Sequence, residues 1–254
     1  MAKSVYVTPE KKELTIPFTV SVLLYMALAL LITGAIGFGL GYFLNQLLNG
    51  ATGDEQLTNN LFITYLIMLI VSGIGILVIT IIMSFMTFKK KNVLVPYIIY
   101  AVFMGILFSS LVGFLDGSYL LSATFVVSAI LFLVMCLFGY IFKGKIGWIL
   151  GILIGACVVC GILCLVNLFL FPWALGVESA FDASCTIYWI IELVMLGVML
   201  ISTFVDMYRI RKIAESGEGS KNVAIYCALN LYTDFIAIFV RVLYIFMLIS
   251  KKND

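Results

Sequence analysis

Charged residues are scarce in this sequence, and histidine is missing altogether. Only 11% of the 254 residues are charged and 64% are hydrophobic, against about 25% charged and about 45–50% apolar in an average soluble domain. Folded in water, such a chain would expose long apolar stretches, so a soluble domain is excluded. The absence of histidine excludes histidine-ligated zinc, histidine general bases and Ser-His-Asp chemistry. The alternating segments of about ten residues that mark a membrane β-barrel are also missing.

What the sequence does contain is long apolar runs, with a mean hydropathy of +1.20. A run of about 20 apolar residues crosses a bilayer as a helix. Seven runs of 22 to 28 residues are present, and no linker or repeat divides them. We therefore predict an all-α polytopic membrane protein, a seven-transmembrane-helix bundle that forms a single domain over residues 1–254. The expected spans are about 19–44, 61–88, 93–114, 119–142, 146–171, 185–210 and 223–249.

The distribution of lysine and arginine predicts the orientation of these spans. Twelve of the fifteen basic residues fall in the amino-terminal tail and the even-numbered loops. The odd-numbered loops carry no basic residue and instead hold five acids, Asp54, Glu55, Asp116, Glu178 and Asp182. The positive-inside rule then places the amino terminus in the cytoplasm, so the basic clusters indicate topology rather than nucleic-acid binding. Short loops and the lack of an N-x-S/T acceptor favour a bacterial plasma membrane.

Glycines recur every four residues on two of the predicted spans. Gly147, Gly151 and Gly155 form one strip, and Gly37 and Gly41 form another. Small-residue strips let helices approach closely in lipid. Both strips therefore predict tight helix packing.

Four charged residues lie well inside predicted spans, where a charge is costly and normally faces the bundle interior. Glu192 and Asp206 are 14 residues apart and share a helix face, and Asp234 and Arg241 are seven apart on the next span. The two spans are joined by a short basic turn, so we expect them to be antiparallel neighbours. Their spacing predicts a Glu192–Arg241 ion pair and brings Asp206 and Asp234 toward each other. A function and a purely structural ion pair are both compatible with this pattern.

Two carboxyl groups close together in a dry interior cannot both ionise easily, so they hold a shared proton and titrate as a unit. Protonated, the Asp206–Asp234 pair would bridge the two helices through a hydrogen bond. Ionised, it would repel itself and could contact a cation such as Ca²⁺, which is the only metal role expected of these residues. The pair therefore predicts a pH-sensitive latch.

Two segments around these aspartates resemble a known family. Residues 228–239, ALNLYTDFIAIF, are similar to the last-helix signature A-L-x-L-Y-L-D-F-I-N-L-F of the Bax-inhibitor-type (transmembrane BAX inhibitor motif) family. Residues 205–211, VDMYRIR, resemble its sixth-helix segment Y-D-T-Q-x-I-K. The resemblance implies a seven-helix fold with a central last helix, and a pH-sensitive calcium leak. It also implies that Asp206 and Asp234 are the paired aspartates that control opening by protonation.

The sequence departs from the family pattern at several positions. Thr233 replaces a leucine and Ala237 replaces an asparagine. The second span carries no charge where some members have an arginine beside the aspartate pair. We hypothesise that Arg241 takes the place of this arginine from another helix.

Three classes of function follow. The leading one is a proton-gated calcium leak channel with Ca²⁺ as the permeant ion, no cofactor, and the bilayer and protons as its partners. The second is a non-conducting regulator or scaffold that binds other membrane proteins, and the third is a proton-coupled transporter, because carboxylates in spans also relay protons. An enzyme is not expected, since metal-dependent intramembrane types need histidine and a dyad alone does not make an aspartyl protease.

Overall fold

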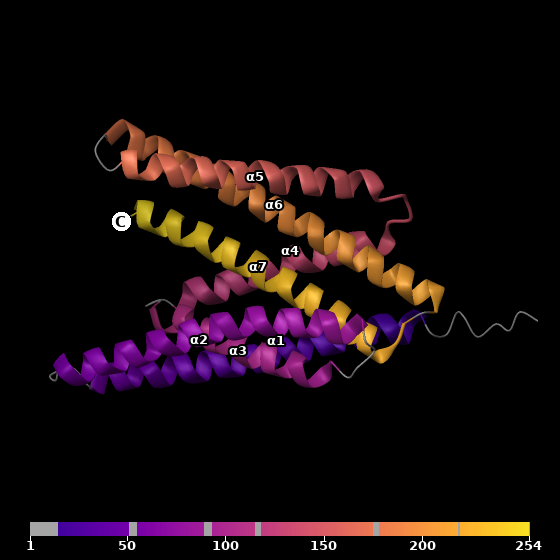
Figure 1. Cartoon of the computed structure of the whole chain (residues 1–254), viewed down its shortest axis with the longest axis horizontal. Coiled ribbons are helices and arrows are strands. Elements are labelled where there is room, and N and C mark those ends of the chain that lie inside the picture. The colour runs from indigo at the N-terminus through magenta and orange to yellow at the C-terminus, as the bar shows by residue number, and fades with distance from the viewer. Residues whose placement is uncertain are drawn as a thin grey trace, which may run out of the picture. The chain divides into compact units, whose positions relative to one another are not determined.

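The computed structural model describes residues 15–50, 55–88, 93–114, 118–174, 178–217 and 219–253, and these residues form helices and short connections without a strand. Figure 1 shows the helices in chain order. They are α1 (Thr15–Gly50), α2 (Glu55–Phe88), α3 (Leu94–Phe114), α4 (Ser118–Ile141), α5 (Gly147–Ala174), α6 (Glu178–Ser216) and α7 (Lys221–Asn253). The seven predicted spans correspond to these seven helices, so the predicted fold class is confirmed. Most helices extend beyond the apolar run, because polar flanking turns also continue the helix.

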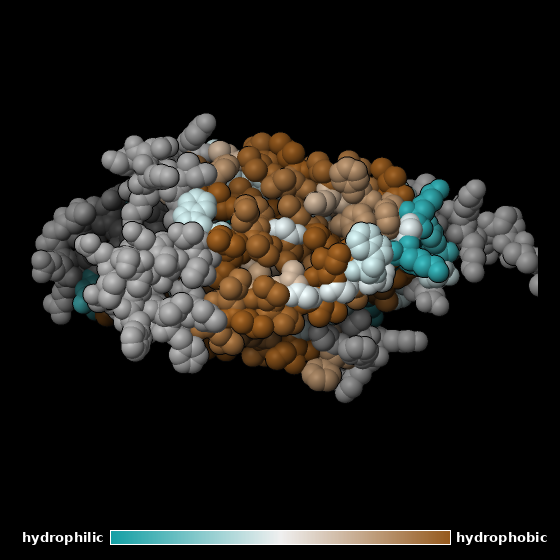
Figure 2. All heavy atoms as spheres, turned by 90° about the horizontal axis from the view of Figure 1, so that it is seen from above, coloured by the Kyte–Doolittle hydropathy of each residue, from teal (hydrophilic) through white to brown (hydrophobic). Residues whose placement is uncertain are grey.

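The helices carry the surface of a membrane protein. Six of them are long and apolar enough to cross a bilayer, and α3 has a shorter apolar stretch, Leu94–Ser110, among its described side chains. Large apolar side chains stand exposed, such as Leu31 at 73% and Leu77 at 67%. On the face shown in Figure 2, hydrophobic residues cover most of the described surface. Burying such a surface in lipid removes the cost of exposing it to water, so the chain is an integral membrane protein.

The chain divides into two compact units that interleave in sequence, Met1–Leu121 with Ile210–Tyr232, and Ser122–Arg209 with Thr233–Asp254. We call them unit 1 and unit 2. In unit 1, α3 packs against both α1 and α2. α1 and α3 approach each other closely at two glycines. A Cβ atom added at Gly37 would lie 3.1 Å from the Cβ of Phe108, and one added at Gly105 would lie 2.8 Å from the Cβ of Ile36. The glycine prediction for α1 is therefore confirmed at Gly37.

A buried polar link joins three helices of unit 1. The hydroxyl of Thr33 on α1 donates to the carbonyl oxygen of Ala101 on α3 (3.1 Å) and is 2.6 Å from the hydroxyl of Tyr232 on α7. Because the Thr33 hydroxyl has a single hydrogen, Tyr232 is the donor in the second bond. Thr33 and Tyr232 are both fully or almost fully buried. The link therefore gives their hydroxyls hydrogen-bond partners, which lipid tails and apolar side chains cannot supply.

Unit 2 is organised around contacts of α4 with α6 and α7. The ring of Phe235 on α7 stacks edge-on against Phe125 and Phe132 of α4. Gly139 of α4 packs directly against the backbone carbonyl of Phe204 on α6, where a side chain would have no room. These contacts set the position of the α6 and α7 segments that carry the predicted site.

Burial differs sharply between the spans. In α7, 67% of the apolar stretch is buried inside the protein, whereas the buried share is 6% in α5 and 17–33% in the other four long spans. Among the six long spans, α7 is therefore the one with the largest buried share. The glycine strip on α5 does not lie against another helix in the described structure, because Gly147, Gly151 and Gly155 face open space. The prediction of tight packing at this strip is therefore wrong.

Candidate functional site

The four ionisable residues singled out in the sequence all belong to unit 2, on α6 and α7. Glu192 is buried, and the Nη1 of Arg241 donates to both of its carboxylate oxygens at 2.5 Å. The ion pair predicted from their spacing is thus present. It pins α6 to α7 with a charge-assisted contact of the strong kind, since both donor and acceptor are ionised.

Asp234 lies in the interior of unit 2, on the face of α7 that meets α6. Its side chain is 8% exposed, and its Oδ1 accepts a hydrogen bond from the hydroxyl of Ser202 on α6 (3.3 Å). Its Oδ2 is buried and has no hydrogen-bond partner among the described residues. Thr203 also lies beside this carboxyl group, but its hydroxyl donates to the Met199 carbonyl oxygen at 3.0 Å. A buried carboxyl oxygen without a donor is costly when charged, so this group is suited to carry a proton.

Asp206 lies one turn of α6 beyond Ser202. Its side chain is 16% exposed, and one carboxylate oxygen is 3.5 Å from the Nη1 of Arg209, whose side chain is 55% exposed. Asp206 and Asp234 interact electrostatically. Asp206 therefore interacts with both the exposed Arg209 and the buried Asp234.

This arrangement can hold and release a proton. A protonated carboxyl group donates one hydrogen bond, whereas two ionised groups repel each other in a medium of low dielectric constant. Among the described residues, no group of three or more acidic or cysteine side chains is placed to hold a metal ion. Two carboxyl groups alone do not resemble a resident calcium site, which takes six to eight oxygen ligands.

Sequence reasoning missed two residues of this site. Ser202 and Arg209 are the side chains that contact Asp234 and Asp206. The available signal was position: Ser202 precedes Asp206 by four residues and Arg209 follows it by three, which places all three on one face of α6. Arg241, expected to stand in for the missing second-span arginine, contacts Glu192, and the cation beside the aspartate pair is Arg209. The acidic residues expected at the outer ends of the spans lie outside the side chains that the structure describes.

The comparison with known families decides the identity. The model of the family described as "Inhibitor of apoptosis-promoting Bax1" matches residues 17–252, nearly the whole chain. The chain belongs to this family. A search of curated protein sequences finds no significant match. The Bax-inhibitor match includes both segments on which the resemblance was based, so that resemblance is confirmed.

Proposed function

We propose that this Bax-inhibitor family member is a pH-sensitive calcium leak channel gated by Asp206 and Asp234. The observation that carries the proposal is the buried Oδ2 of Asp234, which has no donor among the described residues and lies in the field of a second carboxyl group. A single proton shared by the pair removes the repulsion and supplies the missing hydrogen bond. The protonated pair therefore ties α6 to α7.

Loss of the proton reverses this effect. Two ionised carboxylates repel each other and favour separation of the α6 and α7 segments, and together they attract a divalent cation. We expect the channel to be more closed at pH 6 and more open at pH 8. The proposal includes the membrane and orientation expected from the sequence, namely a bacterial plasma membrane with a cytoplasmic amino terminus.

The test is Ca²⁺ flux into liposomes that contain the purified full chain and a trapped calcium dye. Wild type, Asp206→Asn and Asp234→Asn are compared between pH 6 and pH 8, with Glu215→Gln as the control because Glu215 is an exposed acid on α6 that pairs with Arg211. We expect flux that rises with pH in wild type and in the control, and a flat profile in both Asn variants. Variants that conduct like wild type at every pH would contradict the latch.

The same assay separates the other two classes. A non-conducting scaffold predicts no flux above that of empty liposomes at any pH. A proton-coupled transporter predicts a flux that saturates with Ca²⁺ and is driven by an imposed proton gradient. A leak channel instead predicts flux that follows the Ca²⁺ gradient alone.

A further inference from the structure

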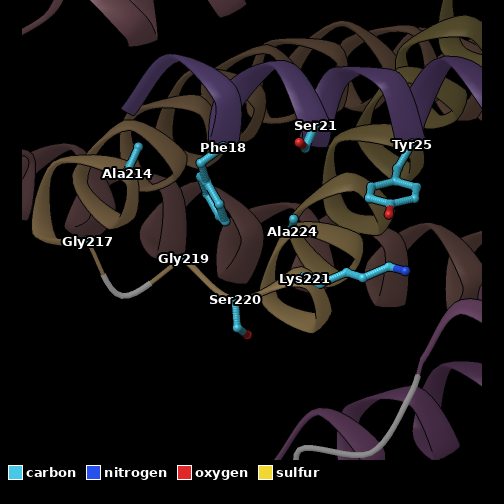
Figure 3. Close-up of a pocket in the computed structure, with 9 residues that line it drawn as sticks. All are labelled: Phe18, Ser21, Tyr25, Ala214, Gly217, Gly219, Ser220, Lys221 and Ala224. Carbon is cyan, nitrogen blue, oxygen red and sulfur yellow. The ribbon is translucent and has the colours of Figure 1, made fainter. Parts of the chain in front are cut away.

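A cavity of about 350 Å³ lies in unit 1, and neither Asp206 nor Asp234 lines it. It is enclosed by the start of α1, the last turn of α6, the connection that follows, and the start of α7. Figure 3 shows Phe18, Ser21 and Tyr25 projecting from α1 toward the α6–α7 connection. On the opposite side the cavity is lined by Gly219, Ser220 and Lys221.

The sequence of the connection builds this cavity. Gly217 has a φ of 72°, a left-handed conformation that glycine adopts without strain, and it ends α6. Gly219 packs so closely under the ring of Phe18 that a side chain there would collide with the ring. Ser220 then caps α7 by accepting a hydrogen bond from the Val223 N–H at 3.4 Å. The close contact between Gly219 and Phe18 thereby holds the connection against α1, and Ser220 and Lys221 line the cavity on this side.

The lining has the chemistry of an anion site. Its polar side chains are three hydroxyls, from Ser21, Tyr25 and Ser220, and one ammonium group, from Lys221. No carboxylate is among the described lining residues. The Lys221 side chain extends from the start of α7 below the ring of Tyr25 in the view of Figure 3. Hydroxyl and ammonium groups that line one cavity suit an oxyanion with several acceptor oxygens.

The level of the cavity along the helices identifies the source of that anion. The predicted apolar spans begin at residue 19 in α1 and at residue 223 in α7, and the span in α6 ends at residue 210, each within about one helical turn of a lining residue. Three span ends therefore meet at the cavity, which places it where lipid headgroups lie. The buried Phe18 ring forms an apolar wall, and Lys221 supplies a basic side chain to the same cavity. Basic pockets at the ends of membrane helices bind anionic headgroups.

We propose that this cavity binds the phosphate group of an anionic phospholipid through Lys221 and the hydroxyls of Ser21, Tyr25 and Ser220. The cavity and its lysine carry the assignment, and the positive end of the α7 dipole adds to the attraction. A bound headgroup would join the start of α1 to the α6–α7 connection. This inference is independent of the proposed calcium flux.

The test is native mass spectrometry of the purified full chain titrated with phosphatidylglycerol or phosphatidylcholine, followed by competition with inorganic phosphate. We compare wild type with Lys221→Gln and Tyr25→Phe, and use Lys212→Gln as the matched control, because Lys212 is an exposed lysine on α6 that does not line the cavity. Losing a hydrogen bond to a charged group predicts about tenfold weaker phosphatidylglycerol binding in Lys221→Gln. Tyr25→Phe is expected to weaken binding less, and Lys212→Gln by no more than about twofold.

The two sources of phosphate give different results. If phosphatidylglycerol binds and millimolar phosphate does not displace it, the lipid is the ligand as proposed. If inorganic phosphate displaces it from wild type, the site recognises the phosphate group alone, and the assignment of the residues still holds. The proposal is overturned if phosphatidylglycerol binds no better than phosphatidylcholine, or if Lys212→Gln weakens binding as much as Lys221→Gln.

Discussion

Arg241 on α7 binds both carboxylate oxygens of the buried Glu192 on α6. This pair lies about two turns along α7 from Asp234, so the two helices that carry the aspartates are tied together at a point that does not depend on the protonation of the aspartates. In the proposed gating, the latch moves one part of the α6–α7 contact while the ion pair holds another.

Arg241→Gln removes the partner of a buried carboxylate. Breaking one side of a buried ion pair costs about 3–5 kcal/mol, so we expect a marked drop in the thermal unfolding temperature of the detergent-solubilised protein. The double variant Glu192→Gln/Arg241→Gln restores much of the loss, because no uncompensated charge remains. If the single and double variants are equally unstable, the ion pair does not contribute in this way.

The same variant tests the hypothesis that Arg241 supports gating. If the ion pair fixes α6 against α7, its removal loosens the frame in which the aspartates meet, and the pH dependence of Ca²⁺ flux changes. The measurement is the liposome assay over pH 6 to 8. An unchanged pH profile in Arg241→Gln would show that the pair is structural only.

Ser202→Ala removes the hydrogen bond to Oδ1 of Asp234. The ionised carboxylate loses a donor that the protonated form needs less, so deprotonation becomes harder. We expect the midpoint of the flux curve to move to higher pH by about one unit, the equivalent of about 1.4 kcal/mol. Ser110→Ala is the control, because the Ser110 hydroxyl bonds to a carbonyl of its own helix α3. Equal midpoints in wild type and Ser202→Ala would remove Ser202 from the site.

The polar link of unit 1 predicts an asymmetry between two substitutions. Tyr232→Phe leaves the Thr33 hydroxyl bonded to Ala101, so it costs about 1 kcal/mol. Thr33→Val strands the buried Tyr232 hydroxyl without its partner and costs about 1–3 kcal/mol. Thermal unfolding measures both, with Tyr42→Phe as an exposed control. A larger loss for Tyr232→Phe than for Thr33→Val would contradict the assigned donor and acceptor.

Two glycines of unit 2 provide a matched pair. Gly139→Ala places a methyl group against the Phe204 carbonyl of α6, whereas Gly151→Ala on α5 meets open space. We expect Gly139→Ala to destabilise the protein by about 1–3 kcal/mol and Gly151→Ala to leave its unfolding temperature unchanged or raised. Because Phe204 is two residues from Asp206, Gly139→Ala should also alter the pH profile of the flux. The opposite order of stabilities would refute the packing described for α4 and α6.

The sequence was sufficient for the helices and for part of the site. The helices were predictable because the thickness of the bilayer requires long apolar runs. The 14-residue spacing on α6 and the seven-residue spacing on α7 led directly to the Glu192–Arg241 pair. The positions of Ser202 and Arg209 on the Asp206 face of α6 were visible in the sequence, but they were not enough to assign the residues to the site, because a serine or a terminal arginine is ordinary until the facing helix is known. The packing prediction for the α5 glycines was wrong for a similar reason. A strip of small residues shows that another helix can approach closely, but it does not show that a neighbouring helix is present. The assignment to a single domain and the gating roles of the aspartates remain predictions.

The sharing of one proton between Asp206 and Asp234 is measured most directly by infrared difference spectroscopy of the reconstituted protein between pH 6 and pH 8. The account predicts one band of a protonated, buried carboxylic acid at pH 6 that fades toward pH 8, and its loss or displacement in both Asp206→Asn and Asp234→Asn. Glu192→Gln/Arg241→Gln should retain the band. A wild-type spectrum without such a band, or a band that persists unchanged in both single Asn variants, would contradict the account.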